Sequence, residues 1–324
     1  MVNTTYLWAI NQALREEMRR DPSVYVLGED VAVGGPYGAT RRLAEDFGEN
    51  RVVNTPISEG TVMGLGVGAA MLGLRPVVEC MFIDFITLAM DQVVNHAAKM
   101  HYISGGQLRV PMVIRALCGA AESFGAHHSQ CLEAWFVHVP GLKVVMPATP
   151  ADAKGLLKAS IRDDNPVLFL EHRGLLNSKG EVPEDDYVIP LGVAEVRRRG
   201  KDVTIAAISN MVLVALEAAR ELEAQGISSE VIDLRTLYPL DMDTVVSSVR
   251  RTNHLVIAHE AVVTGGAGAE ITAQVQEVAL DYLDGPIVRV GAPFAPVPNS
   301  PFLEKCYVPD KDRVVDAVHR ARLS

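Results

Sequence analysis

Residues 52–70 read VVNTPISEGTVMGLGVGAA and place a single carboxylate, Glu59, at the start of a segment that is otherwise apolar and built of small residues. A helix of this composition can pack its backbone closely against a neighbour, and a carboxyl group at its mouth has little water around it. Such a group can be held protonated or share a proton. A structural alternative also fits, because Ser58 and Glu59 are residue types that cap a helix N-terminus.

Outward from this stretch, short β-branched runs alternate with helical patterns. Helical apolar spacing covers residues 7–19, and the Asp-Pro pair at 21–22 ends it. Buried strands are indicated at residues 24–27, 75–80, 112–117, 143–146 and 167–171. Strands separated by helices predict right-handed crossovers and a mainly parallel sheet covered on both faces.

The pattern changes between residues 174 and 202, where turn-forming and charged residues dominate. Beyond it, strand patterns return at residues 203–208, 230–233, 254–258 and 287–290, separated by helical patterns at 211–225, 242–251 and 269–283. We therefore predict an α/β chain of two doubly wound domains with mainly parallel sheets. The first domain spans residues 1–175, a linker spans 176–200, and a smaller second domain spans 201–324.

Composition excludes several classes of protein. A formal net charge of −10 over 324 residues disfavours binding to nucleic acid or to an anionic membrane surface. The apolar segment at 61–74 is shorter than the roughly 20 residues that cross a bilayer, so it is expected to be a core or interface helix, with Gly64 and Gly68 on one close-packing face. Four widely spaced cysteines indicate free thiols in a reducing compartment, and we expect a cytoplasmic protein.

An ordered set of motifs supports a more specific interpretation. The set comprises residues 75–85 (RPVVECMFIDF), 91–95 (DQVVN), 104–106 (SGG), 110–115 (VPMVIR), 127–130 (HHSQ), 231–241 (VIDLRTLYPLD) and 259–266 (HEAVVTGG). Taken together over essentially the whole chain, these motifs resemble the β subunit of the thiamine-diphosphate-dependent E1 component of 2-oxo acid dehydrogenase complexes. The resemblance implies a transketolase-like pyrimidine-binding domain followed by a transketolase C-terminal-like domain.

The resemblance also implies roles for residues in the first domain. Glu59 aligns with the catalytic glutamate that hydrogen-bonds the pyrimidine ring of thiamine diphosphate, and Phe85 aligns with the aromatic residue that stacks on that ring. Three further residues align with the lining of the cofactor pocket, namely Glu29, Ile57 and Met81. Ordinary core packing is the alternative for Phe85 and Met81.

His128 matches the active-site histidine of the family. An imidazole near neutral pH can donate to a developing oxyanion or carry a proton during acyl transfer. A solvated histidine in a polar loop is the alternative, and no third ligand stands at a telling spacing to make His127 and His128 a metal site. Glutamine is common in the family at the position of His127, so this chain departs from the pattern beside an otherwise intact motif.

The resemblance also implies two metal ions, potassium and magnesium. The turn at 161–166 is similar to one whose backbone carbonyls bind a potassium ion, and the implied ligands are Met112, Ser160, Asp163 and Asn165. An ordinary Asp-Asn-Pro turn explains the same residues equally well. The Gly-Asp-Gly segment that usually marks a magnesium-bound diphosphate occurs nowhere in the chain. A partner E1 α subunit is therefore expected to hold Mg²⁺ and the diphosphate, in an α₂β₂ heterotetramer.

The implied reaction is decarboxylation of a 2-oxo acid such as pyruvate, or cleavage of acetoin, with transfer of the acyl group to a lipoyl E2 acyltransferase. Two alternatives remain. The chain could be the C-terminal half of a split transketolase, which should carry basic residues for sugar phosphates. It could also be a non-catalytic assembly subunit, which would have no need of Glu59, Phe85 and His128 together.

Overall fold

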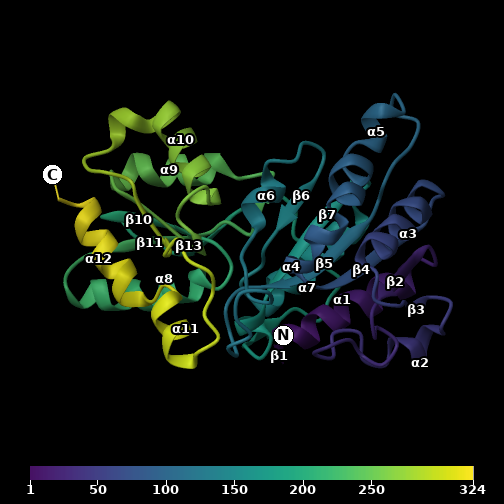
Figure 1. The fold of residues 1–324 in the computed structure, drawn as a ribbon. Coiled ribbons are helices and arrows are strands. Elements are labelled where there is room, and N and C mark those ends of the chain that lie inside the picture. Colours follow the sequence, from purple (N-terminus) through teal and green to yellow (C-terminus); the bar gives the residue numbers. More distant parts are fainter. Residues whose placement is uncertain (324) are drawn as a thin grey trace. The chain divides into compact units, whose positions relative to one another are not determined.

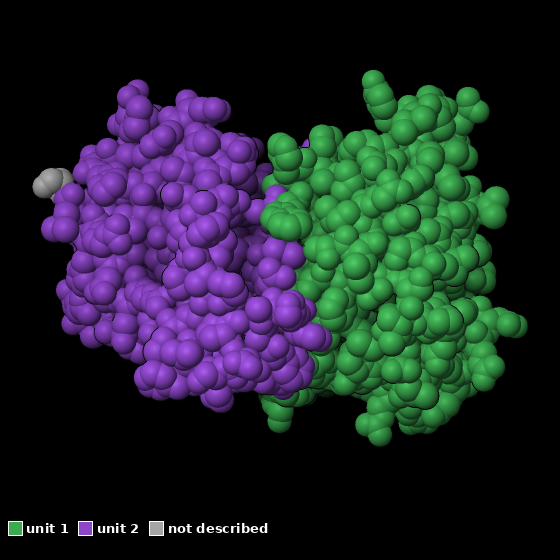
Figure 2. Space-filling model, in the orientation of Figure 1, with its two compact units in different colours: residues 1–118, 135–191 green, residues 119–134, 192–324 purple. Residues whose placement is uncertain are grey.

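The computed structural model describes residues 1–323, which form two compact units (Figure 2). Unit 1 contains residues 1–118 and 135–191. Unit 2 contains residues 119–134 and the chain from residue 192 onward. The short segment 119–134 therefore leaves the first unit and packs within the second, although it lies between two strands of unit 1 in the sequence.

Unit 1 is built on a parallel sheet with the strand order β6-β7-β5-β4-β2-β3. The strands are β2 (Val24–Gly28), β3 (Val52–Asn54), β4 (Arg75–Phe82), β5 (Val113–Cys118), β6 (Lys143–Val145) and β7 (Val167–His172). Residues of β5 and β7 are buried throughout, as expected for strands covered on both faces. The predicted parallel sheet of this unit is confirmed.

Helices cover this sheet. The longer ones are α1 (Tyr6–Arg20), α3 (Glu59–Met71) and α7 (Pro150–Arg162). The N-cap Thr5 accepts a hydrogen bond from Trp8 N at 3.2 Å, and α1 packs along α7 (Figure 1). Shorter helical segments are α2 (Leu43–Phe47), α4 (Ile83–Ile86), η1 (Thr87–Ala89), the π-helix η2 (Asp91–Ala97), α5 (Met100–Ile103), α6 (Glu133–Val137) and η3 (Arg173–Leu175).

Helix α3 packs against β4 through one glycine. A Cβ atom at Gly66 would lie 2.6 Å from Val78 Cγ2, so only glycine allows this approach. Gly64 has its nearest neighbour at 3.7 Å and Gly68 has none within 4 Å. The close contact with the sheet therefore depends on Gly66, while the predicted pair Gly64 and Gly68 lies on a more open part of the helix.

Unit 2 contains a five-stranded sheet with the order β14-β13-β10-β11-β9. Its strands are β9 (Glu195–Arg198), β10 (Val203–Ala207), β11 (Ser229–Asp233), β13 (Leu255–Val262) and β14 (Val288–Ala292); all pairs are parallel except β9 with β11. Figure 1 shows α9 (Met242–Thr252) and α10 (Ala267–Ala279) on one side of this sheet and α8 (Met211–Ala224) and α12 (Lys311–Ala321) on the other. The remaining elements are β12 (Thr236–Tyr238), η4 (Leu280–Tyr282) and α11 (Pro301–Tyr307).

The polar stretch at 174–202 is more ordered than its composition indicated. It contains β8 (Lys179–Val182), which pairs antiparallel with β1 (Val2–Thr5), and also the edge strand β9. Both are short strands at sheet edges, where polar side chains face solvent and leave no apolar alternation to detect. No helix among residues 1–323 is long and apolar enough to cross a membrane.

Candidate cofactor and active site

Glu59 is the first residue of α3. Ser58 stands at the N-cap position, but its hydroxyl makes no hydrogen bond to a backbone N–H; it donates instead to Thr61 Oγ1 at 2.8 Å. The side-chain capping expected from Ser58 is therefore absent. Glu59 itself lies half-buried, facing a small cavity of unit 1.

Carboxylates converge in that cavity, which we call the carboxylate pocket. Its lining consists of Glu29, Glu59, Val62, Met63, Glu79 and Cys80. Burial, followed by repulsion from Glu59 and Asp30, raises the pKa of Glu29 above its usual value. Burial also raises the pKa of the Cys80 thiol, which therefore stays protonated. The pocket thus offers a carboxyl group that retains its proton readily, beside apolar and thiol side chains.

This combination suits a flat, partly apolar ring that carries nitrogen atoms. A protonated carboxyl donates to a ring nitrogen, and a carboxylate accepts from an amino group. Val62 and Met63, both at least 95% buried, supply apolar wall. The donor set and the raised pKa of Glu29 therefore fit the aminopyrimidine of thiamine diphosphate.

The structure brings Glu29 and Glu59 together but does not bring the other three expected pocket residues to the same cavity. Ile57 is 80% exposed. Met81 and Phe85 are half-buried, and the Phe85 ring packs edge-on against Phe82 with centroids 5.7 Å apart. These three residues flank the segments that carry Glu59 and Cys80, so they lie close in the sequence to the pocket without lining it.

A buried ionic cluster, one member of which lines the pocket, could not be predicted from the sequence. The Arg115 guanidinium on β5 donates to both Glu171 oxygens, from Nε at 2.7 Å and Nη2 at 3.0 Å, and from Nη1 to Glu79 Oε2 at 2.7 Å. All three residues are at most 8% exposed. The sequence contains one hint of this cluster. Three mainly apolar strand patterns each hold a charged residue, which is glutamate in two of them and arginine in the third.

His128 lies in unit 2, in the segment 119–134. It is half-buried, its backbone N–H donates to Gly125 O at 3.4 Å, and its ring packs edge-on against Phe124 with centroids 6.3 Å apart. Gly125 has a φ of +72°, and a Cβ there would lie 3.0 Å from Asn299 Cβ, so this turn requires glycine. The neighbouring His127 is exposed.

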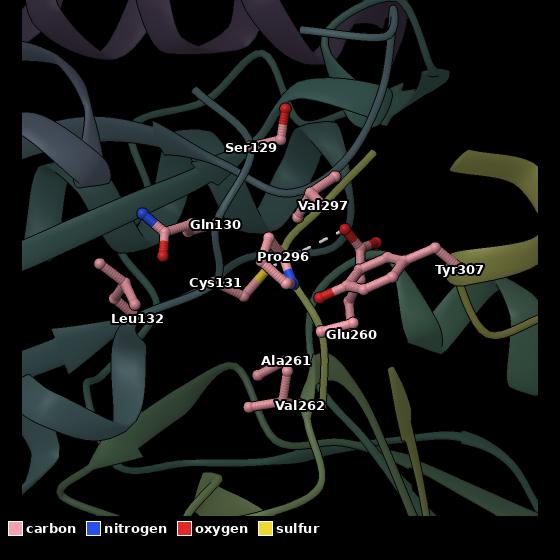
Figure 3. A pocket seen from close by; sticks show the side chains of 11 residues that line it. Ser129, Gln130, Cys131, Leu132, Glu260, Ala261, Val262, Pro296, Val297 and Tyr307 are labelled. Carbon is pink, nitrogen blue, oxygen red and sulfur yellow. Dashed lines mark hydrogen bonds between the residues drawn. The ribbon is translucent and has the colours of Figure 1, made fainter. Parts of the chain in front are cut away.

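The residues that follow His128 line a second cavity, of about 90 Å³, within unit 2 (Figure 3). Glu260, at the end of β13, accepts a hydrogen bond from Ala120 N at 2.6 Å, and the Cys131 thiol lies 3.9 Å from the same carboxylate oxygen. Burial, together with Cys131 and Glu260, raises the pKa of Tyr307 to about 12. Glu260 thus anchors both ends of the segment that carries His128.

The expected cation turn is a well-formed Asx turn. The Asp163 carboxylate accepts hydrogen bonds from Asn165 N and Nδ2, both at 2.9 Å. Arg75 Nη1 donates to the carbonyl oxygens of Ile161 and Asp163, at 3.1 and 2.9 Å. Two other expected ligands already accept backbone hydrogen bonds: Met112 O from Val167 N at 2.9 Å, and Ser160 O from Asp163 N at 3.3 Å. Among residues 1–323, no group of three or more histidine, cysteine, aspartate or glutamate side chains is arranged to bind a metal.

Comparison with known proteins gives a consistent result. Residues 3–179 match the transketolase pyrimidine-binding domain and residues 192–314 match the transketolase C-terminal domain. The chain is 49% identical to the pyruvate dehydrogenase E1 component subunit beta of Rhizobium meliloti, covering 98% of this chain and 70% of the relative. It is 46% identical to the 2-oxoisovalerate dehydrogenase subunit beta of Bacillus subtilis, covering 97% of each chain.

A third relative is the acetoin:2,6-dichlorophenolindophenol oxidoreductase subunit beta of Bacillus subtilis, at 46% identity over 95% of this chain and 94% of the relative. Among solved structures, a split-gene transketolase described as an inactive β4 tetramer superposes with a TM-score of 0.81 at 28% identity, covering 98% of this chain and 97% of the other. The two matched domains and the full-length similarity agree with the fold. The chain therefore belongs to the transketolase-like family of E1 β subunits of 2-oxo acid and acetoin dehydrogenases.

Proposed function

We propose that this chain is the catalytic β subunit of a thiamine-diphosphate-dependent E1 enzyme that decarboxylates a pyruvate-like 2-oxo acid or cleaves acetoin, and passes the acyl group to a lipoyl E2. The observation that carries the proposal is the pairing of Glu29 and Glu59 in the carboxylate pocket. Full-length similarity to pyruvate, 2-oxoisovalerate and acetoin enzymes supports the reaction class.

In this proposal Glu59 and Glu29 bind the pyrimidine half of the cofactor. When bound, thiamine diphosphate supplies a nucleophilic carbon and an electron sink. Glu59 donates a hydrogen bond to a ring nitrogen, and Glu29, whose pKa burial raises, lies beside it in the same pocket. Val62, Met63 and Cys80 keep water away from this hydrogen bond. We assign Phe85, Ile57 and Met81 to the surroundings of the ring from the family resemblance alone, since they lie outside this cavity.

His128 is assigned to the transfer step. Its half-buried imidazole can donate to a developing oxyanion or carry a proton. We expect His128→Ala to reduce acyl transfer to a lipoyl acceptor by about 100-fold or more while changing cofactor affinity little. Transfer is measured with a lipoylated E2 domain, and affinity is measured by cofactor titration. An equal loss of both would indicate that His128 has a structural role instead.

The second half of the site belongs to a partner. Because the chain has no Gly-Asp-Gly segment, we assign Mg²⁺ and the diphosphate to an E1 α subunit, in an α₂β₂ heterotetramer. We assign a cytoplasmic location on the four free thiols.

We also assign a potassium site to the carbonyl oxygens of Met112, Ser160, Asp163 and Asn165. A carbonyl oxygen has two lone pairs, so the hydrogen bonds from Arg75 and the backbone leave room for an ion. Exchange of potassium for sodium should lower the melting temperature by a few degrees. An identical melting temperature in the two salts would contradict the site.

The test of the proposed function is dye-linked oxidation by this chain co-purified with its α subunit, with thiamine diphosphate and magnesium. The substrates are pyruvate, branched 2-oxo acids and acetoin. Reduction of the dye with one of these substrates is the expected result. If an assembly shown to contain cofactor reduces no dye with any of these substrates, the proposal is contradicted.

A split transketolase is the second candidate, because the split-gene transketolase structure has the same fold over nearly the whole chain. Identity of 46–49% to E1 β subunits against 28% to that structure favours the dehydrogenase. Transfer of two-carbon units between sugar phosphates, measured on the same assembly, separates the two. An assembly with neither activity would favour the non-catalytic subunit.

A further inference from the structure

The second cavity, which lies in unit 2 and which we call the Glu260 cavity, has no part in the proposed reaction. Four parts of unit 2 enclose it: residues 129–132, residues 260–262 at the end of β13, residues 295–297 after β14, and Tyr307 at the end of α11 (Figure 3). Its volume is about 90 Å³. A cavity of about 150 Å³ holds benzene, so this one admits only a smaller molecule.

The lining of the Glu260 cavity is partly apolar and carries negative charge. Glu260 is 7% exposed, and its Oε1 accepts a hydrogen bond from Ala120 N at 2.6 Å. A carboxylate can accept about four hydrogen bonds, so this bond does not exhaust it. Val262, Pro296 and Val297 supply an apolar wall, and none of the residues that line the cavity is basic. Such a lining favours a cation over an anion.

The Tyr307 hydroxyl points into this cavity. Tyr307 is 9% exposed, and Figure 3 shows its hydroxyl directed toward Cys131. Among residues 1–323 this hydroxyl has no hydrogen-bonding partner, although a buried phenol usually has one. Burial first, and then Cys131 and Glu260, raise the pKa of Tyr307 to about 12, so the hydroxyl keeps its proton. A ligand in the cavity can therefore satisfy this group.

An organic cation suits the Glu260 cavity better than a bare metal ion does. Among residues 1–323 no group of three or more histidine, cysteine, aspartate or glutamate side chains is arranged to bind a metal, and the cavity brings together only Glu260 and Cys131. A primary ammonium group has three N–H donors for carboxylate and hydroxyl oxygens, and it is attracted to the face of an aromatic ring. Its carbon chain can be buried against the apolar wall.

We infer that the Glu260 cavity binds a small primary ammonium compound with a short apolar chain. Its N–H groups donate to the Glu260 carboxylate and to the Tyr307 hydroxyl oxygen, and its chain lies against Val262 and Val297. This site goes beyond the proposed function, because the 2-oxo acids named there are anions and acetoin carries no charge. Its occupancy can be tested without any turnover.

A ligand in this cavity would contact the segment that carries His128. Residues 129–132, directly after His128, line the cavity. Earlier in the same segment, Ser123 N donates to Glu304 Oε2 at 3.0 Å, and Glu304 lies on α11 together with Tyr307. A ligand that joins residues 129–132 to Tyr307 should therefore restrain this segment and slow its amide hydrogen exchange.

The experiment titrates the full-length chain, in its native assembly, with three molecules of similar size: propylammonium, 1-propanol and propionate. Saturation-transfer NMR measures their affinities. Propylammonium should bind with a dissociation constant in the millimolar range, as expected for so few atoms. The uncharged 1-propanol should bind at least about 10-fold more weakly, and propionate should show no saturable binding.

Two substitutions test the two polar groups. Glu260→Gln removes the charge but keeps an oxygen that can accept from Ala120 N, and should weaken propylammonium binding by about 10-fold or more. Tyr307→Phe removes the hydroxyl but keeps the ring, and should weaken it by about 2- to 10-fold. The exposed residues Glu277 and Tyr282 of unit 2 lie outside the lining, so Glu277→Gln and Tyr282→Phe are matched controls that should bind like the wild type.

Four results would overturn the inference. The first is no saturable binding of propylammonium below about 50 mM. The second is equal affinity for 1-propanol, which would mean that only the apolar wall is recognised. The third is wild-type affinity in Glu260→Gln, or in Tyr307→Phe if Glu260→Gln does not fold. The fourth is binding that leaves amide exchange in residues 119–134 unchanged, which would place the ligand elsewhere.

Discussion

Strand β4 of unit 1 and strand β13 of unit 2 both bury two adjacent ionisable residues, but these residues have different bonding partners in the two strands. Each is an eight-residue parallel strand, almost wholly buried, with two adjacent ionisable residues near its carboxyl end: Glu79 and Cys80 in β4, His259 and Glu260 in β13. In β4 the carboxylate is held by a full opposite charge on Arg115. In β13 the carboxylate accepts a backbone N–H and the histidine bonds to a backbone carbonyl.

The difference shows which unit is suited to proton chemistry. Beside the pocket of unit 1, burial first and neighbouring charges second raise the pKa of Glu29, and burial also raises the pKa of Glu79. In β13 of unit 2, backbone dipoles hold the ionisable pair, and Glu260 fixes the loop that carries His128. Under the proposed function, unit 1 would bind the cofactor's ring and unit 2 would present one histidine.

The largest expected effect comes from removing the cation of unit 1. Arg115→Met leaves two buried carboxylates without a positive partner and should lower the free energy of unfolding by about 3–5 kcal/mol. Urea denaturation at neutral pH measures this loss.

Arg197→Met is the matched variant in unit 2. Asp233 would lose both bonds from Arg197, from Nε at 3.1 Å and Nη2 at 2.9 Å. It would keep the backbone N–H of Arg235 at 3.1 Å, so we expect a smaller loss of about 1–3 kcal/mol. Equal losses of unfolding free energy in Arg115→Met and Arg197→Met would contradict the idea that unit 1 depends more strongly on its buried arginine than unit 2 does.

The second prediction concerns the neutral histidine of unit 2. Burial lowers the pKa of His259 to about 4, and its ring is enclosed by Gly266, Gly268 and Gly291. The unfolded chain therefore binds a proton that the folded chain does not between about pH 6.5 and pH 4. Stability should fall as the pH falls through this range, by up to about 1.4 kcal/mol per pH unit.

His259→Asn supplies the control for that slope. Denaturation of the two proteins at about pH 7, 6 and 5 should show a difference in stability that narrows on acidification. A constant difference across this range would mean that His259 binds a proton as readily in the folded protein as in the unfolded chain.

The smallest effect concerns the loop around Glu79. Gly35→Ala combines a positive φ with a Cβ only 2.7 Å from Glu79 Oε1, and should cost about 2 kcal/mol. Gly48→Ala has the same kind of φ, +82°, but no atom within 4 Å, and should cost about 1 kcal/mol. Thermal denaturation and cofactor titration of both variants are compared. They test whether the contact with Glu79 lowers stability or cofactor affinity more than the strained φ alone does.

The sequence alone predicts the central elements of both sheets, because buried parallel strands leave short apolar runs between turn residues. The strands at 75–80 and 167–171, for example, match β4 and β7 within two residues. It does not reveal that Glu79, Arg115 and Glu171 meet, since this depends on strand order and register. Nor does it reveal that Ala120 bonds Glu260, 140 residues away. Glu59 stands out because its neighbours are small and apolar, whereas Gly66 is indistinguishable from Gly64 and Gly68 without the position of Val78.

The most direct test of the account is the turnover of Glu59→Gln in the assembly with the α subunit. The substitution preserves size and removes the ionisable proton, and the exposed Glu277→Gln on α10 serves as the charge-matched control. We predict that Glu59→Gln lowers turnover by at least about 100-fold with assembly intact, while Glu277→Gln stays close to the wild type. Turnover of Glu59→Gln equal to that of the wild type would contradict the central claim that this carboxyl group serves the cofactor.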